Sequence, residues 1–146
     1  MGTLGLFIFG LLLSLSMASK PECHRQGETL HCLLRTLSTN DSDFPIEAAS
    51  EAVSQVFLRC SDHQSESILR TNHFGYLPHL KKLSIKSCLV KKMPALAFSG
   101  LSGLQGLNFV NNVKQQGRNE AKVILEIEPD AFTGLNDLRS LNFRYV

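Results

Sequence analysis

The side chains best suited to chemistry in this chain are its cysteines and histidines. Among 146 residues there are four cysteines and five histidines, and the densest group is Cys60, Asp62 and His63, with His73 and His79 further along. Thiolates and imidazoles bind zinc and also form nucleophile–base pairs. A zinc site usually shows two pairs of closely spaced ligands, however, and Cys60-x-x-His63 stands alone. We therefore expect no metal, no cofactor and no catalytic residue, and interpret the histidines as surface residues.

The N-terminal segment indicates the cellular compartment to which the protein, and with it the cysteines, is sent. Residues 1–19 carry no charged side chain, and residues 4–15 are nearly all Leu, Ile, Phe and Gly. The run is shorter than the roughly 20 residues of a membrane helix and ends in small residues, so residues 1–18 are predicted to be a secretory signal peptide. The alternative is a buried helix at the extreme N-terminus. A second long apolar segment does not follow, so we expect contact with a membrane only through a continuation of the chain.

An even set of cysteines in a secreted chain favours disulfides. Cys23, Cys32, Cys60 and Cys88 allow three pairings, and the sequence alone does not select one. We favour Cys23–Cys32, which closes a small loop in a polar stretch, and Cys60–Cys88 then follows. The second bridge would close a loop of about 30 residues and contribute on the order of 3 kcal/mol.

Charge and a glycosylation motif describe the surface. The formal net charge of +2 is too small to predict nucleic-acid binding, and the basic pairs Lys81-Lys82 and Lys91-Lys92 are explained by a solvated surface. Asn40-Asp41-Ser42 is an N-glycosylation motif in a polar stretch, so we expect a glycan on Asn40.

An internal repeat is the strongest signal in the sequence. Ala97-Phe98-Ser99-Gly100-Leu101 returns 34 residues later as Ala131-Phe132-Thr133-Gly134-Leu135. A pattern L-x-x-L-x-L-x-x-C/N also recurs, with these members: Leu80, Leu83, Ile85 and Cys88; Leu104, Leu107, Phe109 and Asn112; Leu138, Leu141 and Phe143; and a weaker copy at Val53, Val56 and Leu58. This spacing is typical of leucine-rich repeats. An ordinary α/β domain with leucine-rich helices would not explain the recurrence.

The repeat predicts an α/β fold, a leucine-rich-repeat solenoid with short parallel strands on its concave face. In each strand the L-x-L pair points inward, because alternate side chains share a face. We expect a disulfide-bonded cap over residues 19–52 and about four repeats over residues 53–146, the last incomplete. The repeat starts are 27, 24 and 34 residues apart, and we assign the extra length to residues 113–122. That insertion is expected to be a loop, which either contributes to binding or has no partner.

Three stretches resemble one receptor family: Cys32-Leu33-Leu34-Arg35-Thr36-Leu37, Leu58-Arg59-Cys60-Ser61-Asp62, and Leu83-Ser84-Ile85-Lys86-Ser87-Cys88 continuing to Leu107. They are similar to the N-terminal ectodomain of arthropod Toll receptors, and most of all to the long Toll group that includes Tollo. The resemblance covers about residues 23–143. The segment after Asn108 departs from the pattern of that group, and the chain stops inside a repeat.

The resemblance implies a receptor with further repeats, one transmembrane helix and a cytoplasmic TIR signalling domain. It implies cystine-knot cytokines of the Spätzle type as protein ligands, or cell-surface recognition during development, and we also consider a receptor dimer. Because the sequence stops inside a repeat, we favour a fragment of a longer protein over a complete short product.

The functional prediction is a binding module and not an enzyme. The residues that flank the inward leucines should form a strip on the concave sheet, and we assign ligand contacts to it. The strip comprises Lys82, Ser84, Lys86, Gly106, Asn108, Val110, Ser140, Asn142 and Arg144. Its basic and polar character suits a protein partner with acidic patches. The alternatives are a purely structural cap of a longer solenoid and a free-standing secreted decoy or adhesion protein.

Overall fold

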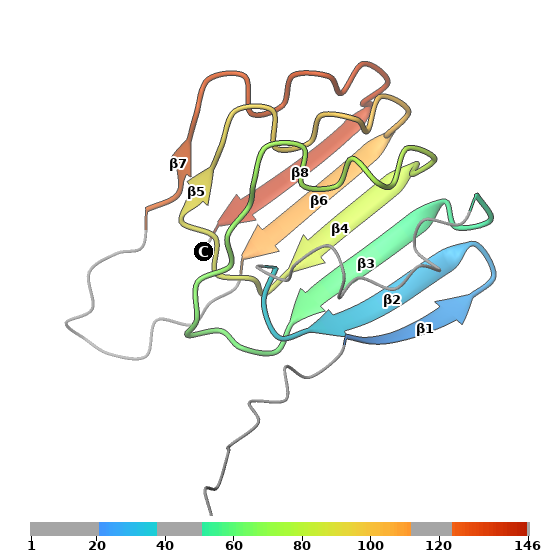
Figure 1. The fold of residues 1–146 in the computed structure, drawn as a ribbon, viewed down its shortest axis with the longest axis horizontal. Helices are drawn as coiled ribbons and strands as arrows, with labels where there is room; N and C mark the ends of the chain where they lie inside the picture. Colours follow the sequence, from blue (N-terminus) through green and yellow to red (C-terminus); the bar gives the residue numbers. More distant parts are fainter. Residues whose placement is uncertain (1–20, 38–50, 112–123, 146) are drawn as a thin grey trace, which may run out of the picture.

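The computed structural model describes residues 21–37, 51–111 and 124–145. Six strands form one sheet in the order β1-β2-β3-β4-β6-β8, and two more form the small sheet β5-β7 (Figure 1). The strands are β1 (Glu22–Gln26), β2 (Thr29–Leu34), β3 (Gln55–Cys60), β4 (Lys82–Lys86), β5 (Lys92–Met93), β6 (Gly106–Asn111), β7 (Glu126–Ile127) and β8 (Ser140–Tyr145). The predicted signal peptide, Asn40 and the loop at residues 113–122 lie outside the described residues.

The strands predicted from the repeat are present and parallel. From β2 to β8 every pairing is parallel, and equivalent repeat positions such as Leu83, Leu107 and Leu141 are direct neighbours across the sheet. The β1–β2 pair, which was not predicted, is antiparallel. Its strands are joined at Gly27-Glu28, where Gly27 takes a φ of +62°, a left-handed conformation that glycine adopts without strain.

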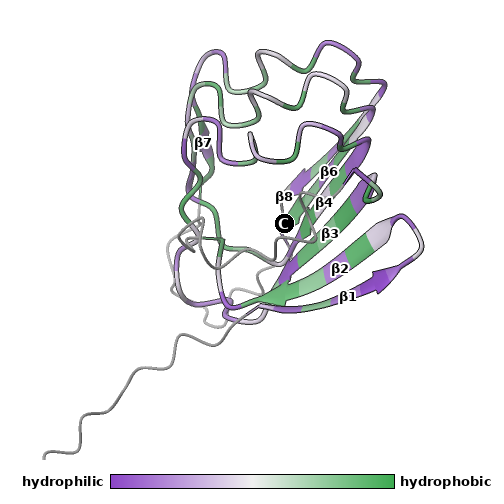
Figure 2. Ribbon diagram, turned by 45° about the vertical axis from the view of Figure 1, so that its right-hand side comes forward, coloured by the Kyte–Doolittle hydropathy of each residue, from purple (hydrophilic) through white to green (hydrophobic). Residues whose placement is uncertain are grey.

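The core lies between the large sheet and the segments that return from one strand to the next (Figure 2). The row of inward side chains Leu30, Val56, Leu83 and Leu107 is at most 2% exposed. Burying one such side chain contributes about 1.5–3 kcal/mol, so these rows hold successive strands together. The same row ends at β8 with Leu141, which is 50% exposed.

The return segments pack through a column of phenylalanines. Phe74, Phe98 and Phe132 stack with ring centroids 5.9 and 5.8 Å apart, and their planes are nearly parallel. Phe98 and Phe132 are the repeated phenylalanines of the sequence pattern, and the structure places them in equivalent positions. Phe74, in His73-Phe74-Gly75-Tyr76-Leu77, is a third member of the column, which the sequence analysis overlooked.

The helical part of the expected α/β fold is absent from the described residues, which form strands, turns and irregular segments. Single turns replace helices, as where the backbone N–H groups of Gly75, Leu77 and Leu80 each donate to the carbonyl three residues earlier. A left-handed residue interrupts each return segment, at Asn72, Leu96 and Asp130, and prevents continuous helical geometry. No helix in this part of the chain has the length and hydropathy that crossing a membrane requires.

Candidate functional site

Alternate residues of each strand point to the face of the large sheet that is turned away from the core. They form three rows that cross the strands, with one residue from each strand in each row. The strand register aligns them, and we call them the first, second and third outer rows. The first is Gln26, Thr29, Gln55, Lys82, Gly106 and Ser140; the second is His24, His31, Phe57, Ser84, Asn108 and Asn142; the third is Glu22, Leu33, Arg59, Lys86, Val110 and Arg144.

The strip predicted from the sequence is assembled on this face. Its nine residues occupy the β4, β6 and β8 positions of the three rows, so that Lys82 lies beside Gly106 and Lys86 lies beside Val110. The inward leucines determine this arrangement, because a one-residue change in register would turn these side chains into the core. The structure therefore brings the predicted residues together, whereas ligand contact by them stays a prediction.

Three polar residues of the second row form a hydrogen-bonded ladder across the strands. The amide nitrogen of Asn142 donates to the side-chain oxygen of Asn108 at 2.8 Å, and the amide nitrogen of Asn108 donates to Ser84 Oγ at 2.8 Å. Ser84 is only 5% exposed. Its neighbours cover Ser84 and its hydroxyl already accepts a hydrogen bond, so it offers little open surface, and ligand contact by it stays a prediction.

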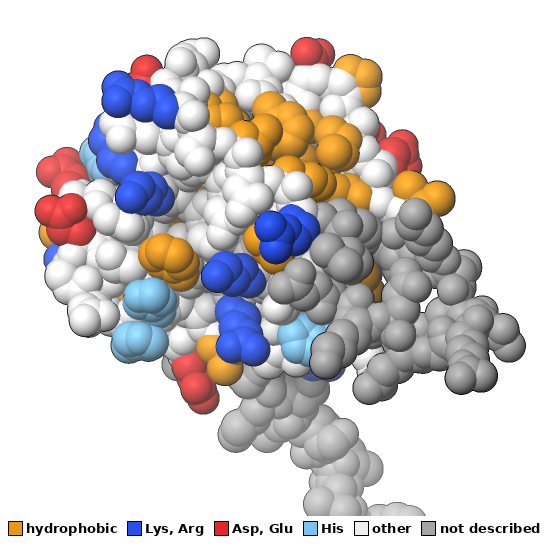
Figure 3. Space-filling view, turned by 180° about the vertical axis from the view of Figure 1, so that it is seen from behind, with side chains coloured by type: hydrophobic (Ala, Val, Ile, Leu, Met, Phe, Trp, Pro, Cys, Tyr) orange, Lys and Arg blue, Asp and Glu red, His pale blue; other side chains and the backbone are white. Residues whose placement is uncertain are grey.

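Positive charge dominates the three outer rows. They contain Lys82, Arg59, Lys86 and Arg144, all exposed, against one acidic residue, Glu22. The ion pairs found among the described residues involve other basic side chains, those of Arg35, His79, Lys91 and Lys92. Figure 3 shows Lys and Arg side chains gathered on the face seen from behind the view of Figure 1, with Asp and Glu near its margins.

The sequence analysis missed an aromatic stack at the N-terminal end of the second row. The His24 and His31 rings stack with centroids 5.1 Å apart, and the His31 and Phe57 rings stack at 4.9 Å. A signal for it existed. If Cys23 pairs with Cys32 across a hairpin, their neighbours His24 and His31 must also be opposite one another, and Phe57 occupies the outward position between two inward apolar residues.

The structure joins Cys23 to Cys32 and Cys60 to Cys88, the pairs favoured from the sequence. The first bridge crosses the β1–β2 hairpin. The second links Cys60, the last residue of β3, to Cys88, two residues after the end of β4. Because Cys60 is in a disulfide, it has no thiol to act as a nucleophile. The described residues contain no group of three or more His, Cys, Asp or Glu side chains arranged to hold a metal ion.

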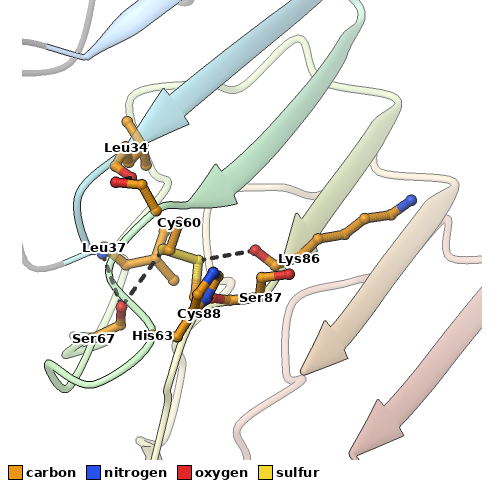
Figure 4. The surroundings of a disulfide bond; sticks show 9 residues. Leu34, Leu37, Cys60, His63, Ser67, Lys86, Ser87 and Cys88 are labelled. Atoms are coloured by element: carbon orange, nitrogen blue, oxygen red, sulfur yellow. Dashed lines mark hydrogen bonds between the residues drawn. A yellow bond between two sulfur atoms is a disulfide. The ribbon is translucent and has the colours of Figure 1, made fainter. Parts of the chain in front are cut away.

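Polar groups lie close to the Cys60–Cys88 bridge, and Ser67 among them is buried (Figure 4). Ser67 Oγ lies 3.7 Å from Cys60 Sγ and accepts a hydrogen bond from the backbone N–H of Leu37 at 3.0 Å. His63 Nδ1 lies 2.9 Å from the carbonyl oxygen of Ser87, which can only accept, so this ring nitrogen carries the proton. The hydrogen bond of His63 to Ser87 joins the segment after β3 to the segment after β4, which is a structural role.

Two carboxylates away from the outer rows have lowered pKa values for structural reasons. Backbone N–H donation from Ser65, with further donors at Gln64 and Arg35, holds the pKa of Asp62 well below its usual range. The hydrogen bond from Lys92 to Glu128 lowers the pKa of Glu128 and raises that of Lys92. Glu128 also accepts from the backbone N–H of Ala95. Both carboxylates stabilise turns, and neither belongs to the outer rows.

Comparison with known proteins finds a likeness to a receptor. Over 115 residues the chain is 30% identical to Toll-like receptor 7 of Drosophila melanogaster, a match that covers 78% of this chain. The same match spans 8% of the length of that receptor. No protein-family model matches the chain. The likeness supports a Toll-like relationship.

Proposed function

We propose that this chain is an extracellular recognition module of a Toll-like receptor and binds a protein partner through the outer face of its sheet. In this proposal the strands, return segments and phenylalanine column are leucine-rich repeats of a solenoid, and the β1–β2 hairpin with its disulfide is part of the N-terminal cap. The likeness to a Toll-like receptor and the equivalent positions of Phe74, Phe98 and Phe132 support this interpretation. Secretion through the predicted signal peptide is consistent with two disulfides.

The observation that carries the binding proposal is the charge of the outer face. Four exposed cations, Arg59, Lys82, Lys86 and Arg144, share that face with the single acid Glu22 and pair with no other described residue. Cations held close together on one surface repel each other, and an acidic partner relieves that repulsion while accelerating encounter. A face that served only as solvated surface would have no need of such an imbalance.

Family resemblance supplies the partner class. We propose a cystine-knot cytokine of the Spätzle type as the protein ligand, with a receptor dimer as the signalling arrangement, and membership of the long Toll group. Each of these extends the likeness beyond the 8% of the relative that the chain covers. Membrane attachment and TIR signalling belong, in this proposal, to a continuation of the same protein.

Charge reversal tests the proposal. The triple variant Lys82→Glu, Lys86→Glu and Arg144→Glu should weaken binding of a Spätzle-type cytokine by about a hundredfold, since reversals that each cost about fivefold multiply to that order. Binding is measured by surface plasmon resonance on the secreted chain, and signalling in cells that express the full receptor. Arg70→Glu is the matched control, because Arg70 is an exposed cation on a return segment. Binding that is equal in the triple variant and the control would remove the outer face from the ligand site.

A further inference from the structure

The rings of His24, His31 and Phe57, at the β1 end of the second outer row, are stacked face to face, so the faces between neighbouring rings are covered. The centroid separations of 5.1 and 4.9 Å match the spacing of neighbouring strands, about 4.8 Å, so the stack runs across the strands. The planes of His24, His31 and Phe57 are within 14° of parallel from one ring to the next. Ring edges carry the positive part of the aromatic quadrupole, and imidazole edges add N–H donors. The exposed border of the stack therefore attracts negative charge.

The third outer row, which runs beside the second, carries cations on β3, β4 and β8 and the acid Glu22 on β1. Arg59 on β3 is the strand neighbour of Lys86 on β4, and Arg144 lies two strands further, on β8. Two apolar side chains adjoin these cations. Leu33 is 41% exposed and is the strand neighbour of Arg59, and Phe57, the partly buried end of the ring stack, lies on the same strand as Arg59. The face thus combines anion-attracting groups with exposed apolar carbon.

We propose that this surface takes an extended acidic segment of a partner protein, laid across the strands from β1 to β8. The inference rests on the proposed protein-binding function and specifies the chemistry of the partner. The carboxylates of the segment would lie against the edges of His24 and His31 and against the cations of the third row. Apolar side chains between them would cover Phe57 and Leu33. Five strand spacings amount to about 24 Å, which an extended chain of about seven residues spans.

Two other occupants fit the surface less well. A second copy of this chain would present the same cations to one another, and like charges brought together oppose binding. A sulfated polysaccharide would satisfy the cations, but it offers little apolar surface to cover Phe57 and Leu33. A partly exposed aromatic side chain on a charged face, such as Phe57, is a typical anchor of a protein interface.

The test uses the secreted full-length chain and a labelled heptapeptide, acetyl-Glu-Phe-Glu-Glu-Phe-Glu-Glu-amide, with affinity measured by fluorescence anisotropy. The double variant His24→Ala and His31→Ala, and the separate variants Arg59→Glu and Phe57→Ala, should each weaken binding about tenfold. Arg70→Glu should leave it unchanged. A peptide with Gln in place of every Glu, and a heparin hexasaccharide, are the comparison ligands. Intact-mass measurement without reductant and circular dichroism verify that each variant keeps both disulfides and its fold.

The outcomes separate this inference from the proposed function. If the cytokine still needs Lys82, Lys86 and Arg144 but the histidine and Arg59 variants bind the peptide normally, the inference fails and the proposed function stands. The inference also fails if the peptide does not bind, or if its Gln version binds equally well. Tighter binding of heparin, unaffected by Phe57→Ala, would assign the surface to polysaccharide instead.

Discussion

Replacing Phe98 by alanine tests whether the phenylalanine column holds the return segments together. Phe98 is fully buried, and its ring stacks on Phe74 on one side and Phe132 on the other. Truncating a buried phenylalanine to alanine costs about 3–5 kcal/mol, because transfer energy is lost and a cavity remains. Both stacking contacts, about 0.5–1.5 kcal/mol each, are lost with it. We expect a loss near 4 kcal/mol.

Phe132→Ala is the internal comparison. Phe132 is only partly buried and stacks on one phenylalanine, so its truncation should cost about half as much, roughly 2 kcal/mol. In urea titrations with a slope of about 2 kcal/mol per M, the midpoints should fall by about 2 M for Phe98→Ala and about 1 M for Phe132→Ala.

A single domain is commonly stable by only about 5–15 kcal/mol, so Phe98→Ala could leave too little folded protein to titrate. Phe98→Leu keeps most of the buried volume and should cost about 1–2 kcal/mol, which keeps the comparison measurable. Equal midpoint shifts for alanine at positions 98 and 132 would refute the reasoning. So would a cost below about 1 kcal/mol for Phe98→Ala, since a fully packed ring cannot be removed so cheaply.

Two further predictions concern the disulfides and acid stability. The bridges close loops with sequence separations of 9 and 28. Replacing the two cysteines of one bridge by alanine should lower the free energy of unfolding by about 2.6 kcal/mol for Cys23–Cys32 and about 3.6 kcal/mol for Cys60–Cys88. A lower denaturant midpoint for the variant without Cys23–Cys32 would contradict the loop-entropy argument. The lowered pKa of Asp62 means that its stabilising effect is present above the ordinary aspartate pKa and is lost as pH falls through the folded-state value. Asp62→Asn should therefore flatten the decline in thermal midpoint between pH 5 and pH 2, and parallel profiles for the two proteins would count against a role for this carboxylate.

The strands were predictable because their inward positions recur at a constant spacing. Leu83, Leu107 and Leu141 are neighbours in the sheet for the same reason that they align in the sequence. The Cys60–Cys88 bridge followed by elimination once Cys23 was paired with Cys32. These features depend on local periodicity, which a single sequence displays directly.

The return segments and the ladder were less accessible to sequence reasoning. The expected α/β class did not specify the conformation of the return segments. The left-handed conformation of Leu96 is set by tertiary packing, since leucine has no intrinsic preference for it. The burial of Ser84 depends on the Asn108 side chain from the next strand, 24 residues away. Phe74 was overlooked because Gly75-Tyr76 replaces the residue pair found in the other two copies, although its distance to the following leucines is the same.

Inward and outward residues of each strand have different roles, and this difference allows the outer face to carry a function. Inward residues such as Leu83 and Ile85 determine the register, and Lys82 and Lys86 then lie on the outer face whatever their charge. The hairpin obeys the same rule, because the Cys23–Cys32 bridge keeps His24 opposite His31. The register that positions the outer residues is consequently determined mainly by the inward residues and the disulfide. The outer rows can therefore be altered to suit a partner without disturbing the core, and their excess of cations needs an explanation other than folding.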